Sequence, residues 1–316
     1  MPAPDTISRI LGNLEKVVVG KRRVLRNLLT AFISGGHVLI EDVPGIGKTI
    51  LARTLARSVQ AEFRRIQFTP DLLPSDVVGV SLYEPARQQF AFKPGPIFGH
   101  IVLADEINRA TPKTQSSLLE GMAEEQVTVD GTTMALPRPF FVIATQNPIE
   151  SQGTYPLPEA QLDRFQMKLR VGYPDLQAEV KILQDQERSH PLDALAPVCT
   201  VADVLALQAA ARAVHVSGEL LEYIVRIAGA TREHPDLLVG ASPRGCLALR
   251  RAAQAIALQA DRDYVIPDDI KDCAVAVLAH RLVLRHQALL EGKTGESLMK
   301  LVLRSVPIEE PEPAKP

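Results

Sequence analysis

Short hydrophobic runs alternate with amphipathic segments through the first half of the chain. The runs are rich in β-branched or aromatic residues: HVLIE (37–41), FRRIQF (63–68), HIVLADE (100–106), PFFVIAT (139–145) and FQMKLRV (165–171). Runs of this length and composition predict strands that are buried on both faces of a parallel sheet. Helical periodicity between them, notably at 48–60 and 112–124, predicts an α/β fold with right-handed crossovers.

Two segments interrupt this alternation. In VSLYEPARQQFAFK (80–93), an alternating run lies on each side of a polar bend, and QVTVDGTTMAL (126–136) has the same arrangement around Asp130 and Gly131. An Asp-Gly pair between alternating runs is a strong hairpin signal. Both segments are therefore predicted to be β-hairpins inserted into the α/β core.

From about residue 174 the strand pattern stops and helical periodicity takes over. Five helices are predicted, at 175–189, 201–213, 219–233, 243–261 and 268–284. Ser242 suits the N-cap of the fourth and Pro243 its first helical position. We therefore expect an α/β core over residues 1–190 and a small all-α domain over 195–305. The Pro- and Glu-rich tail, 306–316, is predicted to be disordered.

The amino-acid composition limits the classes of function that this chain can have. A chain of 316 residues with 46% hydrophobic residues is long enough for about two domains. Its net charge of -2 and its lack of Trp argue against a nucleic-acid binder, which usually has a basic excess and stacking aromatic residues. The N-terminus does not resemble a signal peptide, and no apolar stretch approaches the roughly 20 residues of a membrane span. A cytoplasmic protein is expected.

Candidate chemistry begins directly after the first predicted strand. The segment EDVPGIGKT (41–49) follows this strand and opens a helix, which is the context of a P-loop. In such a loop, backbone N–H groups surround phosphate oxygens, Lys48 reaches the β- and γ-phosphates, and Thr49 ligates Mg²⁺. Asp42 occupies the first glycine position of the usual pattern, whereas Gly45 and Gly47 still supply flexibility. An ordinary glycine turn is the alternative, but the flanking strand and helix favour a phosphate site.

Two further strands end in polar residues. The run HIVLADE delivers Asp105 and Glu106 at its carboxyl end, where ligands bind in open α/β sheets. We expect Asp105 to hold Mg²⁺ through water and Glu106 to polarise the attacking water. The segment FFVIATQNP (140–148) presents Asn147, which could orient that water. On the residues alone a turn cap is the better interpretation of Asn147, since Asn-Pro is common in turns.

These motifs resemble those of the MoxR family within the AAA+ ATPases, and the resemblance covers roughly residues 10 to 300. EDVPGIGKT resembles the family's Walker A motif, including its missing first glycine. The spans 103–131 and 144–165 resemble the family's signatures, and GASPRG (240–245) resembles its sensor-2 motif. The two hairpins also fit the helix-2-insert subgroup, which carries one insert in the second helix and another before sensor 1. The resemblance implies an AAA+ P-loop core followed by a lid domain.

The resemblance also assigns roles to individual residues. It matches Val19 and Gly20 beside the adenine; Pro44, Gly45, Ile46, Gly47, Lys48, Thr49 and Ile50 in Walker A; Asp105 and Glu106 in Walker B; Asn147 at sensor 1; Arg164 as the arginine finger; and Arg244 at sensor 2. The implied ligands are ATP and Mg²⁺. The implied assembly is a hexameric ring with ATP between its subunits.

Arg164 follows Asn147 by 17 residues. We expect a cation there to reach phosphate only if it is presented to a neighbouring subunit, as an arginine finger is. The alternative is a surface ion pair with Glu159 or Asp163, which would contribute at most ~1 kcal/mol.

Arg244 lies in the first turn of its predicted helix, where the helix dipole opposes a cation by roughly 0.3–1 kcal/mol. A residue placed against local preference is a candidate functional residue. The γ-phosphate of bound ATP would supply its counter-charge and tie the lid to the core. A long side chain that reaches water is the alternative. For Arg109 and Lys113, which follow Walker B closely, a solvated helix face is favoured over a contact with a neighbouring subunit or an insert.

The resemblance implies a chaperone-like or maturation ATPase. Its expected partner carries a von Willebrand factor A domain, and its expected clients need cofactor or metal insertion. Because the chain has no extra substrate-binding domain, specificity would lie in the hairpins or in a separate protein. A nucleic-acid motor is one alternative, disfavoured by the acidic pI of about 6.4. A regulatory module that binds nucleotide without turnover is another, disfavoured because Glu106 and Arg164 are both present.

Overall fold

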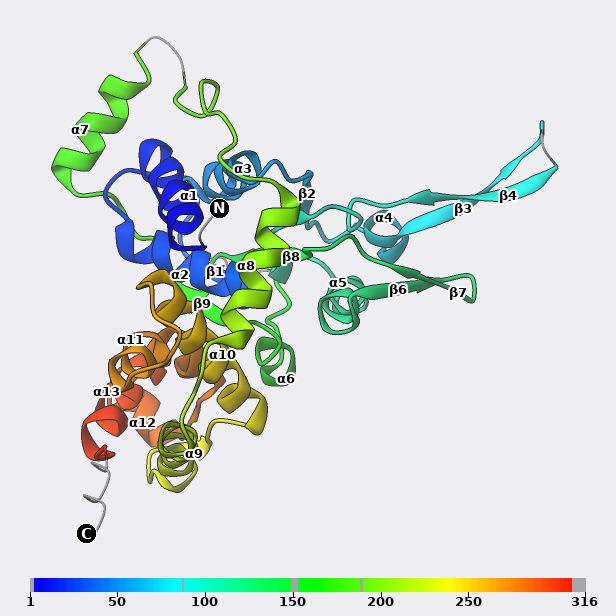
Figure 1. Ribbon diagram of the computed structural model, residues 1–316. Coiled ribbons are helices and arrows are strands. Elements are labelled where there is room, and N and C mark those ends of the chain that lie inside the picture. Colours follow the sequence, from blue (N-terminus) through cyan, green and yellow to red (C-terminus); the bar gives the residue numbers. More distant parts are fainter. Residues whose placement is uncertain (1–2, 87, 149–152, 188–189, 309–316) are drawn as a thin grey trace.

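A five-stranded parallel sheet lies at the centre of the computed structural model, which describes residues 3–86, 88–148, 153–187 and 190–308 (Figure 1). Its strands, in spatial order, are β2 (Phe63–Gln67), β5 (Ile101–Asp105), β8 (Phe141–Gln146), β1 (Val38–Glu41) and β9 (Met167–Leu169). All four ladders are parallel. The five hydrophobic runs are therefore confirmed as strands, and the carboxyl ends of β5, β8 and β1 lie side by side.

Both faces of this sheet are covered, which explains why its strands are almost continuously apolar. Along β1, Val38 and Ile40 join one hydrophobic cluster, whereas Leu39 joins the other. The first cluster is formed with α1 (Ala3–Val17), α2 (Arg22–Ile33), α3 (Lys48–Ser58) and the C-terminal helices. The second is formed with α5 (Pro112–Glu124). Alternate side chains of each strand thus pack into different halves of the core.

The two inserted hairpins are also confirmed. The first follows the short α4 (Pro74–Val78) and pairs β3 (Gly79–Glu84) with β4 (Gln89–Pro94); the second pairs β6 (Gln126–Val129) with β7 (Thr132–Ala135). Asp130 and Gly131 both have positive φ, 51° and 77°, as a tight hairpin turn requires. The hairpins project together from one side of the molecule (Figure 1).

The C-terminal half is helical, but it is not entirely α. Its helices are α7 (Leu176–Asp185), α8 (Val201–Ala213), α9 (Gly218–Glu233), α10 (Pro243–Gln259), α11 (Pro267–Leu278), α12 (His286–Leu290) and α13 (Gly295–Ser305). Ser242 caps α10 by accepting the N–H of Gly245 at 3.2 Å, as expected.

The prediction that strands stop after residue 174 is wrong. β10 (Leu237–Val239) pairs antiparallel with β11 (Val283–Leu284). The helix expected over 268–284 ends at Leu278, and a 3-10 turn, Ala279–Arg281, leads into β11. A short apolar run such as LVL suits a strand as well as a helix, so that periodicity alone could not separate them.

The C-terminal helices share one hydrophobic cluster with α1, α2 and β1. The division into a core over 1–190 and a lid over 195–305 therefore stays a prediction. Of the tail expected to be disordered, residues 309–316 lie outside the described residues. Within the described residues, none of the helices has the length and apolar character that a membrane span needs.

His37, directly before β1, is fully buried between the sheet and α5. Its Nδ1 accepts the N–H of Val142 at 3.1 Å, so that Nε2–H donates to the carbonyl of Met122 at 3.1 Å. Burial lowers the pKa of His37 from 6.5 to about 4; the Met122 bond and Glu125 oppose this shift, and Arg244 adds to it.

We expect this histidine to make the protein less stable as the pH falls. The unfolded chain binds a proton near pH 6.5 and the folded chain only near pH 4, so the free energy of unfolding should decrease through that window. The slope from one such group is about 1.4 kcal/mol per pH unit. Because burial also lowers the pKa of His280, the test compares wild type with His37→Gln by urea unfolding at pH 7 and pH 5. Equal losses in both proteins would contradict the assignment.

Candidate functional site

The loop between β1 and α3 has a backbone that favours glycine. Gly45 and Gly47 have φ of 84° and 87°, in the left-handed region. Gly47 immediately precedes Lys48, the first residue of α3. The first N–H groups of a helix have no acceptor within the helix, so that this end of α3 offers donors to an anion.

Asp42, which departs from the glycine of the usual P-loop pattern, has a structural role. Its carboxylate accepts three backbone N–H groups, from Val43 at 2.9 Å, Val171 at 2.8 Å and Gly172 at 2.6 Å. These bonds tie the start of the loop to the segment after β9. The backbone carbonyl of Asp42 accepts a bond from Nζ of Lys48 at 2.6 Å. A glycine at this position could not anchor the loop in this way.

The carboxylates after β5 lie close to this lysine. Partial burial lowers the pKa of Lys48, while Asp105, Asp42 and Glu106 act on it in the opposite direction. Thr145 on β8 donates its hydroxyl to Asp105 at 2.6 Å and accepts the backbone N–H of Glu106 at 2.8 Å. Glu106 itself has φ 57° and ψ 49°, a left-handed conformation that is uncommon for a residue with a side chain.

Three donors that the sequence analysis did not single out for this role hold these carboxylates. Arg65 places Nη2 2.7 Å from Asp105, while Gln67 and Arg109 donate to Glu106 at 2.9 and 3.1 Å. Arg65 and Gln67 belong to β2, which is adjacent to β5, and Gln67 is in register with Asp105. Their place depends on the strand order, which a single sequence does not reveal.

Arg109 and Lys113 differ from each other more than the sequence suggested. Arg109 ends the 3-10 helix Ile107–Arg109, and its side chain is 41% exposed but forms an ion pair with Glu106 at 3.1 Å. Lys113, in the first turn of α5, is exposed, as the favoured interpretation had it. Proximity to the carboxylate therefore separates two cations that look alike in the sequence.

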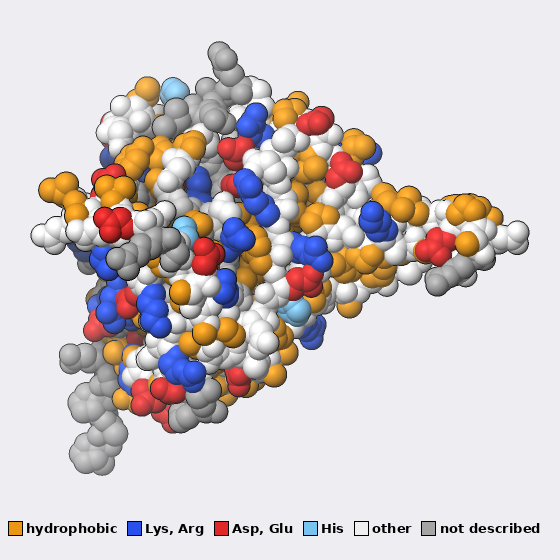
Figure 2. All heavy atoms as spheres, turned by 90° about the horizontal axis from the view of Figure 1, so that it is seen from above, with side chains coloured by type: hydrophobic (Ala, Val, Ile, Leu, Met, Phe, Trp, Pro, Cys, Tyr) orange, Lys and Arg blue, Asp and Glu red, His pale blue; other side chains and the backbone are white. Residues whose placement is uncertain are grey.

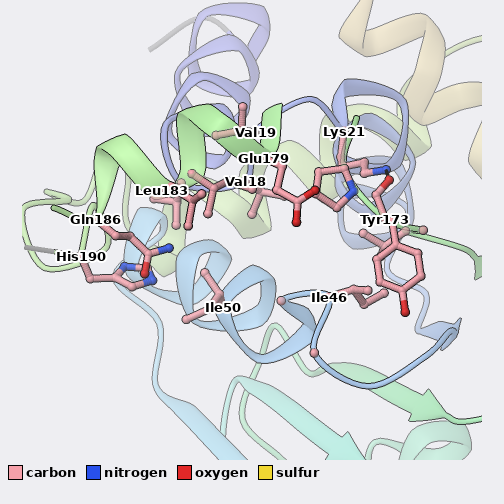
Figure 3. Close-up of a pocket in the computed structure, with 17 residues that line it drawn as sticks. Val18, Val19, Lys21, Ile46, Ile50, Tyr173, Glu179, Leu183, Gln186 and His190 are labelled. Carbon is pink, nitrogen blue, oxygen red and sulfur yellow. Dashed lines mark hydrogen bonds between the residues drawn. The ribbon is translucent and has the colours of Figure 1, made fainter. Parts of the chain in front are cut away.

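A cavity of about 450 Å³ adjoins the loop (Figure 3). Val19 and Ile50 lie on its apolar walls, and the segment after β9 adds Tyr173. Helix α7 covers another side, with Leu183 and Gln186 among its lining residues. A volume of this size is typical of small-molecule sites. The sequence analysis placed Val19 here and missed the contribution of α7.

Gly20 does not line the cavity, but it lies against α7, which does. Its φ is 77°, and a side chain on it would place Cβ 3.0 Å from Cβ of Ala178 in α7. Nearby, Nζ of Lys21 donates to the carbonyl of Tyr173 at 2.6 Å. The turn at Gly20 therefore allows α7 to pack closely against the segment between α1 and α2.

The remaining two candidates lie at the other end of the sheet. Since β9 runs parallel to β1, Arg164, just before β9, lies at the amino edge, whereas Lys48 follows the carboxyl edge. Arg164 donates Nη1 to the carbonyl of Leu119 at 2.6 Å. The alternative of a pair with Asp163 is not favoured, because the Asp163 carboxylate is 2.8 Å from Nε of Arg281.

Arg244 lies at the amino edge of the sheet, where its charge acts on His37, the residue before β1, and on Arg281. Ser242, two residues before Arg244, donates its hydroxyl to Asp163 at 3.2 Å. The expectation that the γ-phosphate of ATP supplies the counter-charge of Arg244 stays a prediction. The structure brings Lys48, Thr49, Asp105, Glu106 and Asn147 to one edge of the sheet, and Arg164 and Arg244 to the opposite edge.

Two family models match the chain. The model described as ATPase family associated with various cellular activities (AAA) matches residues 37–167, and the model described as AAA lid domain matches residues 229–301. The first match covers four strands of the parallel sheet and ends at Met167, the first residue of β9. The second begins inside α9 and ends inside α13.

Curated relatives cover almost the entire chain. YeaC of Bacillus subtilis is 53% identical over 302 residues, which are 96% of this chain and 94% of that protein. Chaperone MoxR1 of Mycobacterium tuberculosis is 42% identical over 95% of this chain and 82% of its own length. Protein MoxR of Methylorubrum extorquens is 32% identical over 96% and 95% of the two chains.

A solved structure agrees with these relatives. The crystal structure of a proposed ATPase from Cytophaga hutchinsonii has a TM-score of 0.91 and 40% identity, and the match covers 98% of this chain and 96% of that one. At this identity the likeness extends beyond the fold. The relatives, the two AAA domains and the motifs together show that this chain belongs to the MoxR family of AAA+ ATPases.

Proposed function

We propose that this protein hydrolyses ATP at the carboxyl edge of its sheet. The observation that carries the proposal is the convergence of Lys48 with Asp105 and Glu106 beside the cavity of about 450 Å³. A cation and a helix terminus suit the phosphates, and the apolar cavity that Val19 lines suits the base. Two carboxylates at the same edge suit metal binding and activation of water.

Each residue then has one role. The loop from Pro44 to Ile50 surrounds the phosphates. Thr49 and Asp105 offer a hydroxyl and a carboxylate oxygen, the donors that Mg²⁺ prefers. When bound, Mg²⁺ neutralises charge on the phosphate oxygens. Glu106 accepts a proton from the attacking water, and Asn147 orients that water.

Arg164 and Arg244 are proposed to serve the ATP of a neighbouring subunit. Both lie at the edge of the sheet opposite Lys48, so that neither is placed to reach this chain's own phosphates. A ring brings the amino edge of one subunit to the carboxyl edge of the next. We therefore propose a cytoplasmic hexameric ring in which each ATP lies between subunits.

The two hairpins are proposed to contact the client. Leu82, Tyr83 and Phe90 of the first hairpin are 50%, 53% and 73% exposed, and Figure 2 shows hydrophobic side chains along the projection. Large exposed apolar residues mark interaction sites for other proteins. One relative is named a chaperone. By family resemblance, the partner carries a von Willebrand factor A domain and the clients need cofactor or metal insertion.

A trap experiment tests this function. Glu106→Gln should bind ATP, hydrolyse it very slowly and hold its client long enough for affinity capture and mass spectrometry. Adding Phe90→Ser should lower client recovery at least several-fold, because it removes the most exposed aromatic ring of the hairpin. The matched control is Leu290→Ser on α12, whose side chain is 75% exposed and distant from the hairpins. Equal loss with both serine variants, or with neither, would argue against a client site on the hairpin.

A further inference from the structure

The segment that bears Arg164 runs from residue 163 to residue 166, between α6 (Glu159–Leu162) and β9. The C-terminal helical domain contacts the residues on both sides of Arg164. Asp163 accepts a bond from Ser242 at 3.2 Å. Gln166 donates its amide to the carbonyl of Ala248 at 2.7 Å, and both of those partners belong to the N-terminal half of α10 or to its cap.

Arg281 makes the most extensive of these contacts. Only 3% of its side chain is exposed. Nε lies 2.8 Å from the Asp163 carboxylate, and Nη2 donates to the carbonyl of Phe165 at 2.7 Å. Nη1 donates to Val277, one turn earlier in the same domain. A planar guanidinium with three nitrogens in use thus links the helical domain to the residues on both sides of Arg164.

The electrostatics show that this contact depends on both partners. Burial lowers the pKa of Arg281, whereas Asp163 acts in the opposite direction and Arg244 adds to the lowering. An arginine remains charged in a protein. A buried charge must be paired, so Asp163 and Arg281 hold each other in place.

We infer that Arg281 is a positioning residue for the arginine finger. It fixes the backbone around Arg164 to the helical domain, so that a movement of that domain moves Arg164 with it. A change of domain angle in one subunit would then alter the finger presented to the next subunit's ATP. This inference rests on the proposed function of Arg164 in a ring.

A second arginine of the same domain provides a matched control. Arg262 donates to both carboxylate oxygens of Asp269, at 2.6 and 2.9 Å, and only 20% of its side chain is exposed. Its hydrogen-bond partners are Tyr264 and Asp269, which lie outside the segment 163–166. Arg262→Lys therefore alters a partly buried Arg–Asp pair without touching the segment that bears Arg164.

The first measurement compares Arg281→Lys with Arg262→Lys. Lysine keeps the charge but replaces the planar fork with one ammonium, so the segment loses its fixed geometry. Misplacement by about 1 Å can slow a reaction by up to about 10²-fold. We expect kcat for ATP to fall by about 10- to 10²-fold in Arg281→Lys and to stay within about twofold in Arg262→Lys. Affinity for a fluorescent ADP analogue should be unchanged in both. Loss of analogue binding in Arg281→Lys would make Arg281 a general structural residue and overturn the inference.

The second measurement separates positioning from general damage. Arg281→Lys subunits keep an intact P-loop, and Lys48→Ala subunits keep an intact Arg164. Mixing the two should restore ATP hydrolysis, because some interfaces combine both intact parts. If Arg164→Ala recovers on mixing with Lys48→Ala but Arg281→Lys does not, the inference fails and the proposed function stands. If neither recovers although subunit exchange is demonstrated, action on a neighbouring subunit fails, and the inference fails with it.

Discussion

Replacing Arg164 with alanine is expected to reduce ATP hydrolysis by about 10³-fold or more, the usual effect of losing an arginine finger. Binding of ATP should be unaffected, because Arg164 lies at the amino edge of the sheet and the P-loop at the carboxyl edge. The substitution should disturb the fold only slightly, since the guanidinium of Arg164 donates to a neutral carbonyl, that of Leu119.

The measurement is a mixing experiment with Lys48→Ala. Each variant alone should be almost inactive, and activity should return when subunits exchange, because some interfaces then join an intact Arg164 to an intact P-loop. Arg138→Ala is the matched control: Arg138 also precedes a strand at the amino edge, and its 72% exposed side chain pairs with Glu125 at 2.8 Å. Normal turnover by Arg164→Ala alone would remove it from the catalytic machinery.

The parallel sheet was predictable because each of its strands is buried on both faces. Such strands are almost wholly apolar, and the runs around Leu39, Val102 and Val142 have this character. The order of the strands was not predictable in the same way. β8 lies between β1 and β5 although it follows them in sequence, and only the three-dimensional packing reveals this.

The residues of the candidate site also fall into a predictable group and an unpredictable group. Residues in contiguous motifs, such as Lys48, Asp105 and Glu106, could be named from strand and loop patterns. Arg65 and Gln67 could not, because β2 reaches Asp105 and Glu106 only as the neighbour of β5. Sequence analysis can find a site within one strand–loop–helix unit but not across adjacent strands.

The placement of Arg244 shows a related limit. The motif of Arg244 and the start of its helix could be recognised in the sequence, and Ser242 does cap α10. Which edge of the core that helix end faces depends on long-range contacts. One is the bond from Ser242 to Asp163, which are 79 residues apart in the sequence. Another is the bond from Arg281 to Asp163, which are 118 residues apart. Local periodicity carries no information about contacts of that range.

Lys48→Ala and Glu106→Gln are expected to inactivate the enzyme in different ways. Lys48→Ala removes the cation at the phosphates, so that ATP affinity should fall below detection. The apo protein should remain folded, because burial already disfavours the charged form of this lysine. Glu106→Gln keeps the shape of the side chain and the backbone N–H bond to Thr145 at 2.8 Å, but it loses the proton acceptor. ATP should therefore bind normally, and turnover should fall by about 10²- to 10⁴-fold.

Titration with a fluorescent ATP analogue and a phosphate-release assay separate the two effects. The analogue should bind Glu106→Gln with wild-type affinity and should not bind Lys48→Ala. A control for altered charge is Glu125→Gln: this carboxylate also has a left-handed backbone, φ 51°, and an arginine partner, Arg138, but it follows α5 far from the P-loop. It should hydrolyse ATP normally. If Glu106→Gln did so too, the proton would have another acceptor. Asp105 would be the carboxylate to replace next, since the Thr145 hydroxyl that accepts the backbone N–H of Glu106 at 2.8 Å donates to Asp105 at 2.6 Å.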